Sequence, residues 1–278
     1  MAEVKDVVDG EYPLTRDYVD FNRLNLQHYQ LKDLFGYNIH PKIPHHQKSL
    51  KIADVGTGTG IWLLDVASQL DPSAELYGLD CDISQVAPKE WLPENLTLRE
   101  WSVFDDVPED LAGKFDIMNI RLFILVISDD PRPVIQRLLK LLKPGGYLQW
   151  GEIDPLNTSI VTASPDLPTD YHKALFRENH PKNSRMVAPW IRDLPQIFEE
   201  QGLLDVEADW RNGKPHAVLA MHWCCLHIHE MVIGRVRRSN PEKAAELDAI
   251  FQGTLAEARK GVAFSIDRVV VVGQKPLQ

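Results

Sequence analysis

The stretch KIADVGTGTGIW, which runs from Lys51 to Trp62, joins a short apolar run to three alternating glycines. Gly56, Gly58 and Gly60 stand where a pattern typical of a buried strand gives way to one typical of an amphipathic helix. At such a junction, free backbone N–H groups and the positive end of the helix face a ligand. Glycines also let a ligand approach the backbone closely. The stretch therefore predicts a strand–loop–helix unit that binds a ligand.

Strands and helices continue to alternate after this unit. The runs that indicate strands lie at residues 50–56, 74–80, 96–103, 114–122 and 146–154. Helical patterns lie between them at residues 60–70 and 132–142. Strands that alternate with helices form right-handed βαβ units and a mostly parallel sheet. We therefore expect an α/β fold with helices on both faces of one sheet.

Helical additions flank this core. Apolar residues and His28 recur at helical spacing between Tyr18 and Leu31, and the alternation breaks after Asp154. Later helical patterns lie at residues 170–179, 216–236 and 241–260, and later strand patterns at 203–212 and 267–276. We expect a helical cap (1–48), a cofactor-binding core (49–154), and a substrate-side insertion with helices and final strands that complete the same domain (155–278). The cap and the insertion can close over a pocket.

Composition argues against several classes of function. The net charge of −10 and the pI near 5.5 disfavour a nucleic-acid or anionic-membrane partner. The N-terminus lacks the apolar segment of a secretory signal, and no window holds the roughly 18 apolar residues of a membrane span. Cys81, Cys224 and Cys225 lack zinc or disulfide spacing, so we expect reduced thiols in a cytoplasmic protein. The apolar helix at 216–236 belongs either to the core or to a homodimer face.

The glycines and the residues around them distinguish between cofactors. Asp80 ends the second strand about twenty residues after the loop, where an acidic residue binds ribose hydroxyls in Rossmann-like folds. The spacing D-x-G-x-G-x-G, however, differs from the G-x-G-x-x-G of dinucleotide sites. Asp54 would also repel a pyrophosphate, whereas its charge suits the ammonium group of S-adenosylmethionine (SAM). The pattern thus favours SAM over NAD.

Four stretches together resemble the ordered motifs of class I SAM-dependent methyltransferases. They are IADVGTGTGIWLLDVA, LYGLD, FDIMNIRLFI and LLKPGGYLQWGEID. The segment RLNLQHYQLKDLFGYNIHPKIP, the tripeptide NIR and the final DRVVVVGQKP resemble the fungal LaeA-like (UMTA-type) methyltransferases of secondary metabolism. The resemblance covers about Tyr12 to Pro276. It implies a Rossmann-like core and a small natural product as methyl acceptor.

The resemblance also implies roles for individual cofactor-binding residues. Gly56, Thr57, Gly58 and Gly60 would shape the loop on the methionine side, and Asp54 would face the SAM ammonium. Asp80 would accept hydrogen bonds from both ribose hydroxyls, and Cys81 would lie against the adenine. Arg121 would meet the methionine carboxylate or an oxygen of the acceptor. Where the family often has an adenine-binding Asp, this chain has Ser102, followed by Val103.

Methyl transfer from a sulfonium is a direct displacement that depends on alignment and imposes no fixed catalytic motif. A general base helps where the acceptor carries a proton. Our catalytic candidates are Glu152, at the end of the fifth strand, and two histidines, His222 and His28. Aromatic residues that can form a pocket for a flat acceptor are Trp150, Tyr171, Trp190 and Trp223. The histidines lack metal-ligand spacing, so we expect no metal.

Two other functions fit the same cofactor motif. The chain can bind SAM without transferring methyl, as a LaeA-like regulator or as a pericyclase-like catalyst that uses the cation electrostatically. It can also be an NAD-dependent oxidoreductase, although the glycine spacing and Asp54 argue against this.

Overall fold

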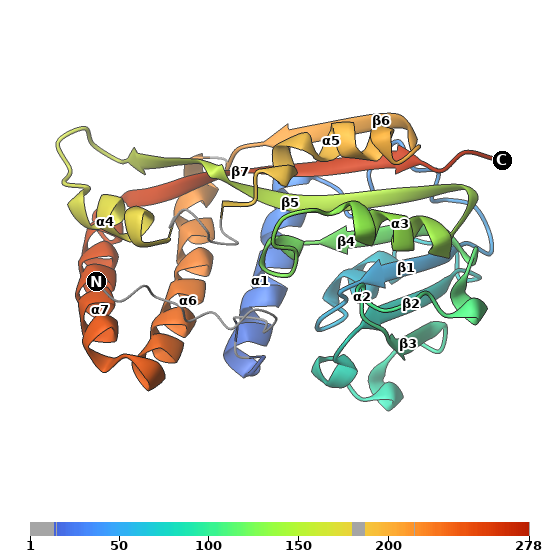
Figure 1. Ribbon diagram of the computed structural model, residues 1–278, viewed down its shortest axis with the longest axis horizontal. Coiled ribbons are helices and arrows are strands. Elements are labelled where there is room, and N and C mark those ends of the chain that lie inside the picture. The colour runs from blue at the N-terminus through green and yellow to red at the C-terminus, as the bar shows by residue number, and fades with distance from the viewer. Residues whose placement is uncertain (1–13, 15, 180–186, 214, 278) are drawn as a thin grey trace.

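A computed structural model describes residues 14, 16–179, 187–213 and 215–277 of the chain. Its strands form one seven-stranded sheet in the order β3-β2-β1-β4-β5-β7-β6 (Figure 1). The strands are β1 (Lys51–Val55), β2 (Glu75–Asp80), β3 (Leu96–Glu100), β4 (Phe115–Arg121), β5 (Leu142–Thr162), β6 (Leu204–Arg211) and β7 (Val262–Gln274). Strands β1 to β5 pair in parallel, whereas β7 runs antiparallel to both β5 and β6. The expected mostly parallel sheet is confirmed.

Helices pack on both faces of the sheet. They are α1 (Tyr18–Phe35), α2 (Ile61–Ala67), α3 (Arg132–Leu141), α4 (Asp170–Asn179), α5 (Trp190–Glu200), α6 (Pro215–Ser239) and α7 (Pro241–Ala258). On one face, Ala53 and Val55 of β1 pack in a core with apolar residues of α3 and α5. On the other face, Ile52 packs with Trp62 of α2. This division follows from the alternation of side chains along each strand.

Two elements differ from the sequence expectation. Strand β5 does not end at Asp154: pairing with β7 shifts register between Asp154 and Thr158 and then continues to Thr162. Helix α5 has no counterpart among the helical patterns that we expected from the sequence. It forms because Trp190, Ile191 and other apolar residues on one side of it are buried against the sheet, and it keeps Pro195 inside the helix.

Helix α1 provides the cap over the core. Asp17 begins it by accepting hydrogen bonds from the N–H groups of Val19 and Asp20, and Gly36 ends it with a left-handed backbone. The chain then turns sharply, so that Phe35 and Tyr37 flank Gly36 at the end of the helix. Residues 1–13 and 15 of the expected cap lie outside the described residues.

Helix α6 differs from our expectation that no segment is long and apolar enough to span a membrane. Within the described residues, Pro215–Ser239 is a helix long and apolar enough to cross a membrane, and 39% of its most apolar window is buried inside the structure. We had expected no such window. Its buried residues pack against α1, α7 and β7, as Met221 and Leu226 illustrate. These contacts are those of a core helix in a globular domain.

Candidate cofactor and acceptor site

The glycine loop follows β1 and adopts a conformation that requires glycine. Gly56, Gly58 and Gly60 all have positive φ angles, of 66°, 53° and 75°. The N–H of Gly56 donates to the carbonyl of Leu79, which ties the loop to the end of β2. A Cβ at Gly56 would lie 2.5 Å from the ring of Phe123. The loop is therefore packed tightly between β2 and the turn that follows β4.

Asp54 is a buried carboxylate beneath this loop. Asn119, its neighbour on β4, donates to Oδ1 at 2.7 Å, and the hydroxyl of Thr57 donates to Oδ2 at 2.9 Å. Burial raises the pKa of Asp54 to about 6, although the Arg121 charge and the two hydrogen bonds oppose that rise. The site thus holds a carboxylate that a nearby cation would stabilise in its charged form.

Asp80 ends β2 and faces the same loop. Its Oδ2 accepts the N–H of Gly58 at 2.8 Å, and its Oδ1 accepts the N–H of Asp82 at 3.0 Å. Each carboxylate oxygen has a second lone pair that can accept another donor. Cys81 follows at the surface, and Arg16 donates to its sulfur at 3.4 Å.

Ser102 and Val103 lie just after β3, next to β2 in the sheet. The Ser102 hydroxyl accepts the N–H of Phe104, and Val103 is buried. The carboxyl ends of β1, β2 and β4 meet where the strand order reverses, between β1 and β4, which is where open α/β sheets bind ligands. The cofactor residues predicted on β1, β2 and β4 therefore gather at that point.

Helix α1 covers the glycine loop from the solvent side. Leu24 lies 3.5 Å from the position of a Cβ on Gly58, and the Thr59 hydroxyl donates to Asn25 at 2.6 Å. Farther along the helix, His28 and Lys32 contact Asp65 of α2. Helix α1, which belongs to the expected cap, thus lies over the glycine loop.

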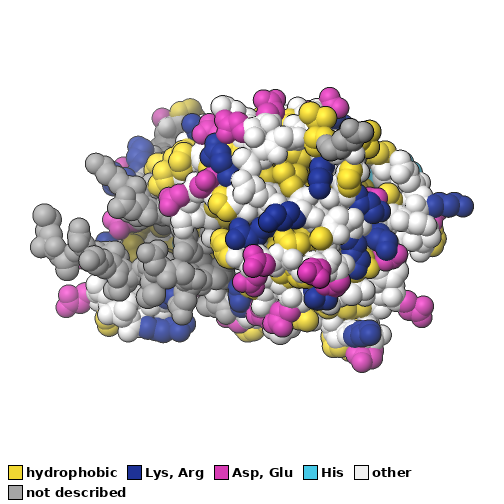
Figure 2. Space-filling view, turned by 45° about the vertical axis from the view of Figure 1, so that its right-hand side comes forward, with side chains coloured by type: hydrophobic (Ala, Val, Ile, Leu, Met, Phe, Trp, Pro, Cys, Tyr) yellow, Lys and Arg dark blue, Asp and Glu magenta, His cyan; other side chains and the backbone are white. Residues whose placement is uncertain are grey.

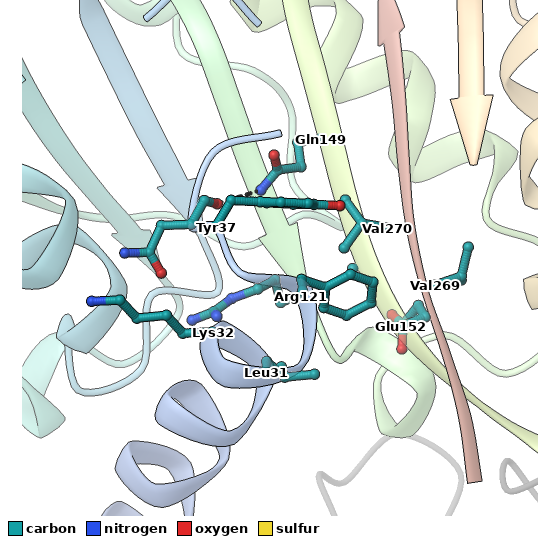
Figure 3. Close-up of a pocket in the computed structure, with 11 residues that line it drawn as sticks. Leu31, Lys32, Tyr37, Arg121, Gln149, Glu152, Val269 and Val270 are labelled. Carbon is teal, nitrogen blue, oxygen red and sulfur yellow. Dashed lines mark hydrogen bonds between the residues drawn. The ribbon is translucent and has the colours of Figure 1, made fainter. Parts of the chain in front are cut away.

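A pocket lies between the end of α1 and strands β4, β5 and β7 (Figure 3). Its free volume is about 20 Å³, which is room for about one water molecule. Figure 3 shows Arg121 near its middle, Tyr37 and Gln149 on one side and Leu31 on the other. Its apolar walls are Leu31, Phe35, Tyr37, Val269 and Val270. The lining of this pocket is therefore mostly apolar.

Glu152 lies at one end of this pocket, beside Val269 (Figure 3). The side chain is buried, and its Oε1 accepts from the Trp150 indole and from the N–H of Phe123. Its Oε2 is buried and has no hydrogen-bond partner among the described residues. Burial raises the pKa of Glu152 to about 7, although hydrogen bonds from the Trp150 indole and from neighbouring backbone N–H groups oppose that rise. Such a carboxyl can exchange a proton near neutral pH.

A comparison with protein-family models matches the part of the chain that holds the glycine loop. A family model described as "Methyltransferase domain" matches residues 46–202, from just before β1 to just after α5. The chain belongs to this methyltransferase family. The glycine loop, Asp54, Asp80 and Glu152 all lie inside the matched region.

Curated fungal proteins are similar to this chain over parts of their length. Methyltransferase grgD of Penicillium sp is 36% identical over 138 residues, which are 48% of this chain and 48% of grgD. N-methyltransferase gliN of Aspergillus fumigatus is 30% identical over 216 residues, which are 74% of this chain and 72% of gliN. The chain spans about half the length of the first curated relatives it matches.

A chain in a solved complex has a similar fold. A chain from the complex between the Haloferax volcanii Trm112 methyltransferase activator and a methyltransferase has a TM-score of 0.54 and 15% identity. The likeness covers 96% of this chain and 98% of that chain. At this identity it shows the fold alone.

The aromatic residues that we predicted for the acceptor do not line this pocket. Trp150 and Trp190 are buried in the core between the sheet and α5. Trp223 packs among α4, α6 and β7, and Tyr171 is half exposed with its ring against Gly253. The sequence shows that these residues are aromatic, but not which face of an element each occupies.

The pocket instead uses residues that sequence reasoning missed. Phe35, Tyr37 and Asn38 come from the end of α1, and Gln149 comes from β5. The signal was the stretch LFGYN, in which aromatic residues flank a glycine at the end of a helix. Gln149 donates to Asn119 and to the Asn38 carbonyl, so it joins the cap to β4.

The two histidine candidates lie in different parts of the structure. His28 is next to Arg121, but both of its ring nitrogens are engaged, one with Asp65 and one with Arg121. His222 lies 3.2 Å from His172 and against Phe264, which pairs with Ile160 on β5. Ile160 lies eight residues beyond Glu152 along β5. The structure therefore does not bring His222 to the pocket. Within the described residues, no group of three or more His, Cys, Asp or Glu could hold a metal ion.

Proposed function

We propose that this chain transfers the methyl group of SAM to a nucleophilic O, N or S atom of a small, mostly apolar secondary metabolite by direct displacement. The observation that carries the proposal is the pairing of a glycine loop between two acidic residues, Asp54 and Asp80, with an adjoining apolar pocket that ends at Glu152. Membership of the methyltransferase family supports it. The name of gliN, an N-methyltransferase, favours nitrogen as the acceptor atom.

The residues fit SAM by their chemistry. Asp54 supplies a buried negative charge for the ammonium, and burial is what raises its pKa. Asp80 has acceptor capacity left for the ribose hydroxyls. Arg121 supplies guanidinium donors for the methionine carboxylate. Cys81, Ser102 and Val103 would border the adenine at the ends of β2 and β3.

The bound cofactor would supply an electrophilic methyl group on a sulfonium. The chain would contribute alignment, because well-oriented partners gain effective molarities of about 10⁵–10⁸ M. The walls formed by Phe35, Tyr37 and Val270 would exclude water and orient the acceptor. Glu152 would accept the acceptor's proton at Oε2, the oxygen that has no partner. This role requires an ionised Glu152, a form available above pH 7.

We further propose that the partner is a small molecule, with residues 1–48 as the cap and 155–278 as the substrate side of one domain. In the face drawn in Figure 2, basic and acidic side chains are interspersed outside the grey atoms. The net charge of −10 supports a chain that binds neither nucleic acid nor anionic membrane. A cytoplasmic location and a homodimer through α6 belong to the same proposal, and size-exclusion chromatography with light scattering tests the dimer.

Calorimetry with SAM and S-adenosylhomocysteine tests the cofactor, with NAD as the control ligand. We expect micromolar binding of both sulfur compounds and no heat from NAD. Incubation with methyl-labelled SAM and a fungal metabolite extract, followed by mass spectrometry, tests the transfer. A metabolite heavier than its precursor by fourteen mass units plus the mass of the label supports the proposal. Cofactor binding without any labelled product contradicts methyl transfer.

A further inference from the structure

A chain of three side chains links α2, α1 and β4 beneath the cap. His28 is almost fully buried, with 1% of its surface exposed. Its Nε2 lies 2.9 Å from Oδ2 of Asp65, and its Nδ1 lies 3.2 Å from Nη1 of Arg121. Asp65 also accepts from Lys32 and Asn38, so it is a fixed anchor.

The partners of His28 determine where its proton lies. Arginine only donates, and an ionised carboxylate only accepts. Burial alone would raise the pKa of Asp65, but hydrogen bonds from Lys32, Asn38 and His28 lower it to about 2, so it is ionised. His28 must then donate from Nε2 and accept at Nδ1, which is the neutral form. A protonated ring would turn an N–H toward the guanidinium of Arg121, and burial together with that charge lowers the pKa of His28 to about 4.

Arg121 has donors left over after this contact. Its hydrogen bond within the described residues goes to His28, and no carboxylate there lies within 4 Å of the guanidinium. Asp54 is near enough to raise the pKa of Arg121 through its charge, but the two side chains form no ion pair, and Asp54 instead accepts from Asn119 and Thr57. A partly buried guanidinium with unused donors is suited to a carboxylate, which it binds through two parallel hydrogen bonds.

We propose that His28 is a positioning residue: its neutral ring transmits the Asp65 anchor to Arg121 and holds the guanidinium where it receives the carboxylate of the cofactor's methionine moiety. This inference rests on the proposed function. His28 is then not a base, because neither nitrogen is available to an acceptor. It also links cofactor binding to the cap, since His28 belongs to α1 and its anchor to α2.

Two substitutions separate the two contacts of the ring. In His28→Asn, the amide oxygen stands near the position of Nδ1 and can accept from Arg121, but the contact with Asp65 is lost. In His28→Gln, the amide nitrogen stands near the position of Nε2 and can donate to Asp65, but the acceptor for Arg121 is lost. The pair therefore distinguishes a residue that orients Arg121 from one that only fastens the cap.

The experiment measures dissociation constants for S-adenosylhomocysteine and for 5′-methylthioadenosine, which lacks the amino-acid carboxylate. We expect His28→Gln to weaken S-adenosylhomocysteine about tenfold or more, since hydrogen bonds to charged groups are the strong ones. Its affinity for methylthioadenosine stays within about twofold. We expect His28→Asn to retain more affinity for S-adenosylhomocysteine than His28→Gln does. Arg121→Gln should give the same selective loss, and it tests the inference even if a His28 variant does not fold.

Three results would overturn the inference: unchanged affinity in His28→Gln and Arg121→Gln, equal weakening of both ligands, or a larger loss in His28→Asn than in His28→Gln. If the unaltered protein binds neither ligand, the proposed function itself fails. If it binds both and the variants show no selective loss, the inference alone fails.

Discussion

Asp80 serves two purposes at the residue scale. It anchors the glycine loop by accepting the N–H of Gly58, and it accepts the N–H of Asp82 in the turn that follows. The ribose role that we propose would use the remaining lone pairs of the same carboxylate. The side chain is therefore structural before the ligand arrives and would be a binding group afterwards.

Substitutions at Asp80 test the ribose role. Asp80→Ala should leave the fold intact and abolish measurable SAM binding, because both acceptors and the Gly58 anchor are lost. Asp80→Asn keeps one oxygen for the N–H of Gly58 and should weaken SAM by about 10- to 100-fold, the scale of hydrogen bonds to a charged group. Calorimetry gives the affinity, and circular dichroism gives the fold. Unchanged SAM affinity in both variants would show that the ribose assignment is wrong.

The raised pKa of Glu152 predicts a pH dependence of turnover. Burial raises that pKa to about 7, so the carboxyl is protonated below pH 7 and ionised above it. If the ionised form accepts the acceptor's proton, kcat at saturating SAM should rise with pH through 7 and level off about one pH unit higher. Saturation matters because Asp54, with a pKa of about 6, would titrate on the cofactor side.

Glu152→Gln is the matched variant for this prediction. It should lower kcat by about 10²–10⁴-fold, the usual contribution of a general base, and remove the rise with pH. Affinity for SAM should stay nearly unchanged. Equal losses in kcat and SAM affinity would instead assign Glu152 to the cofactor or to the structure.

At the element scale, the sequence was sufficient for the core of the sheet but not for the pocket. Strands β1 and β4 could be predicted because apolar runs end at glycines or polar residues. The sequence could not show on which face of the sheet a buried side chain lies. Trp150 packs on Phe198, whereas its neighbours Gln149 and Gly151 line the pocket. The pocket exists only where the end of α1 lies over β5 and β7, a contact between segments far apart in the sequence.

The glycine loop and the turn after β4 form one packed unit, and Gly56→Ala tests it. The new Cβ would meet the Phe123 ring at 2.5 Å and hold a φ of 66°, and Phe123 donates to Glu152. Gly113→Ala is the control, because it has a similar φ of 60° and nothing within 4 Å of the new Cβ. We expect Gly56→Ala to lower the free energy of unfolding by about 1–3 kcal/mol more than Gly113→Ala. Equal effects in urea denaturation would mean that Phe123 moves aside without cost.

At the scale of the whole molecule, the long strands β5 and β7 join two regions. One holds the glycine loop and the pocket, and the other packs α4, α6 and α7 around a buried polar group (Figure 1). In that group His172 donates from Nδ1 to Glu257, so its Nε2 can accept from Nε2 of His222. Burial lowers the pKa of His222 to about 3, and the neighbouring His172 contributes less to the same shift. Both rings are therefore neutral, and we expect their contribution to be stability.

The last prediction concerns His222, which we expect to affect stability but not activity. Because its pKa is about 3 in the folded protein and about 6.5 when unfolded, the unfolded chain binds more protons between these values. Stability should therefore fall as pH drops from 7 toward 5, by up to about 2 kcal/mol from this group. His222→Gln keeps a donor for His172 without titrating, so it should remove that part of the fall in urea denaturation.

In the same His222→Gln variant, affinity for S-adenosylhomocysteine at pH 7 should stay within about twofold, and turnover should persist, because His222 lies outside the pocket. Glu152→Gln should show the reverse, with turnover lost and no such gain in acid stability, since burial raises that pKa rather than lowering it. If His222→Gln were as inactive as Glu152→Gln while folding normally, His222 would be the base, and the second region would have to close over the first during the reaction.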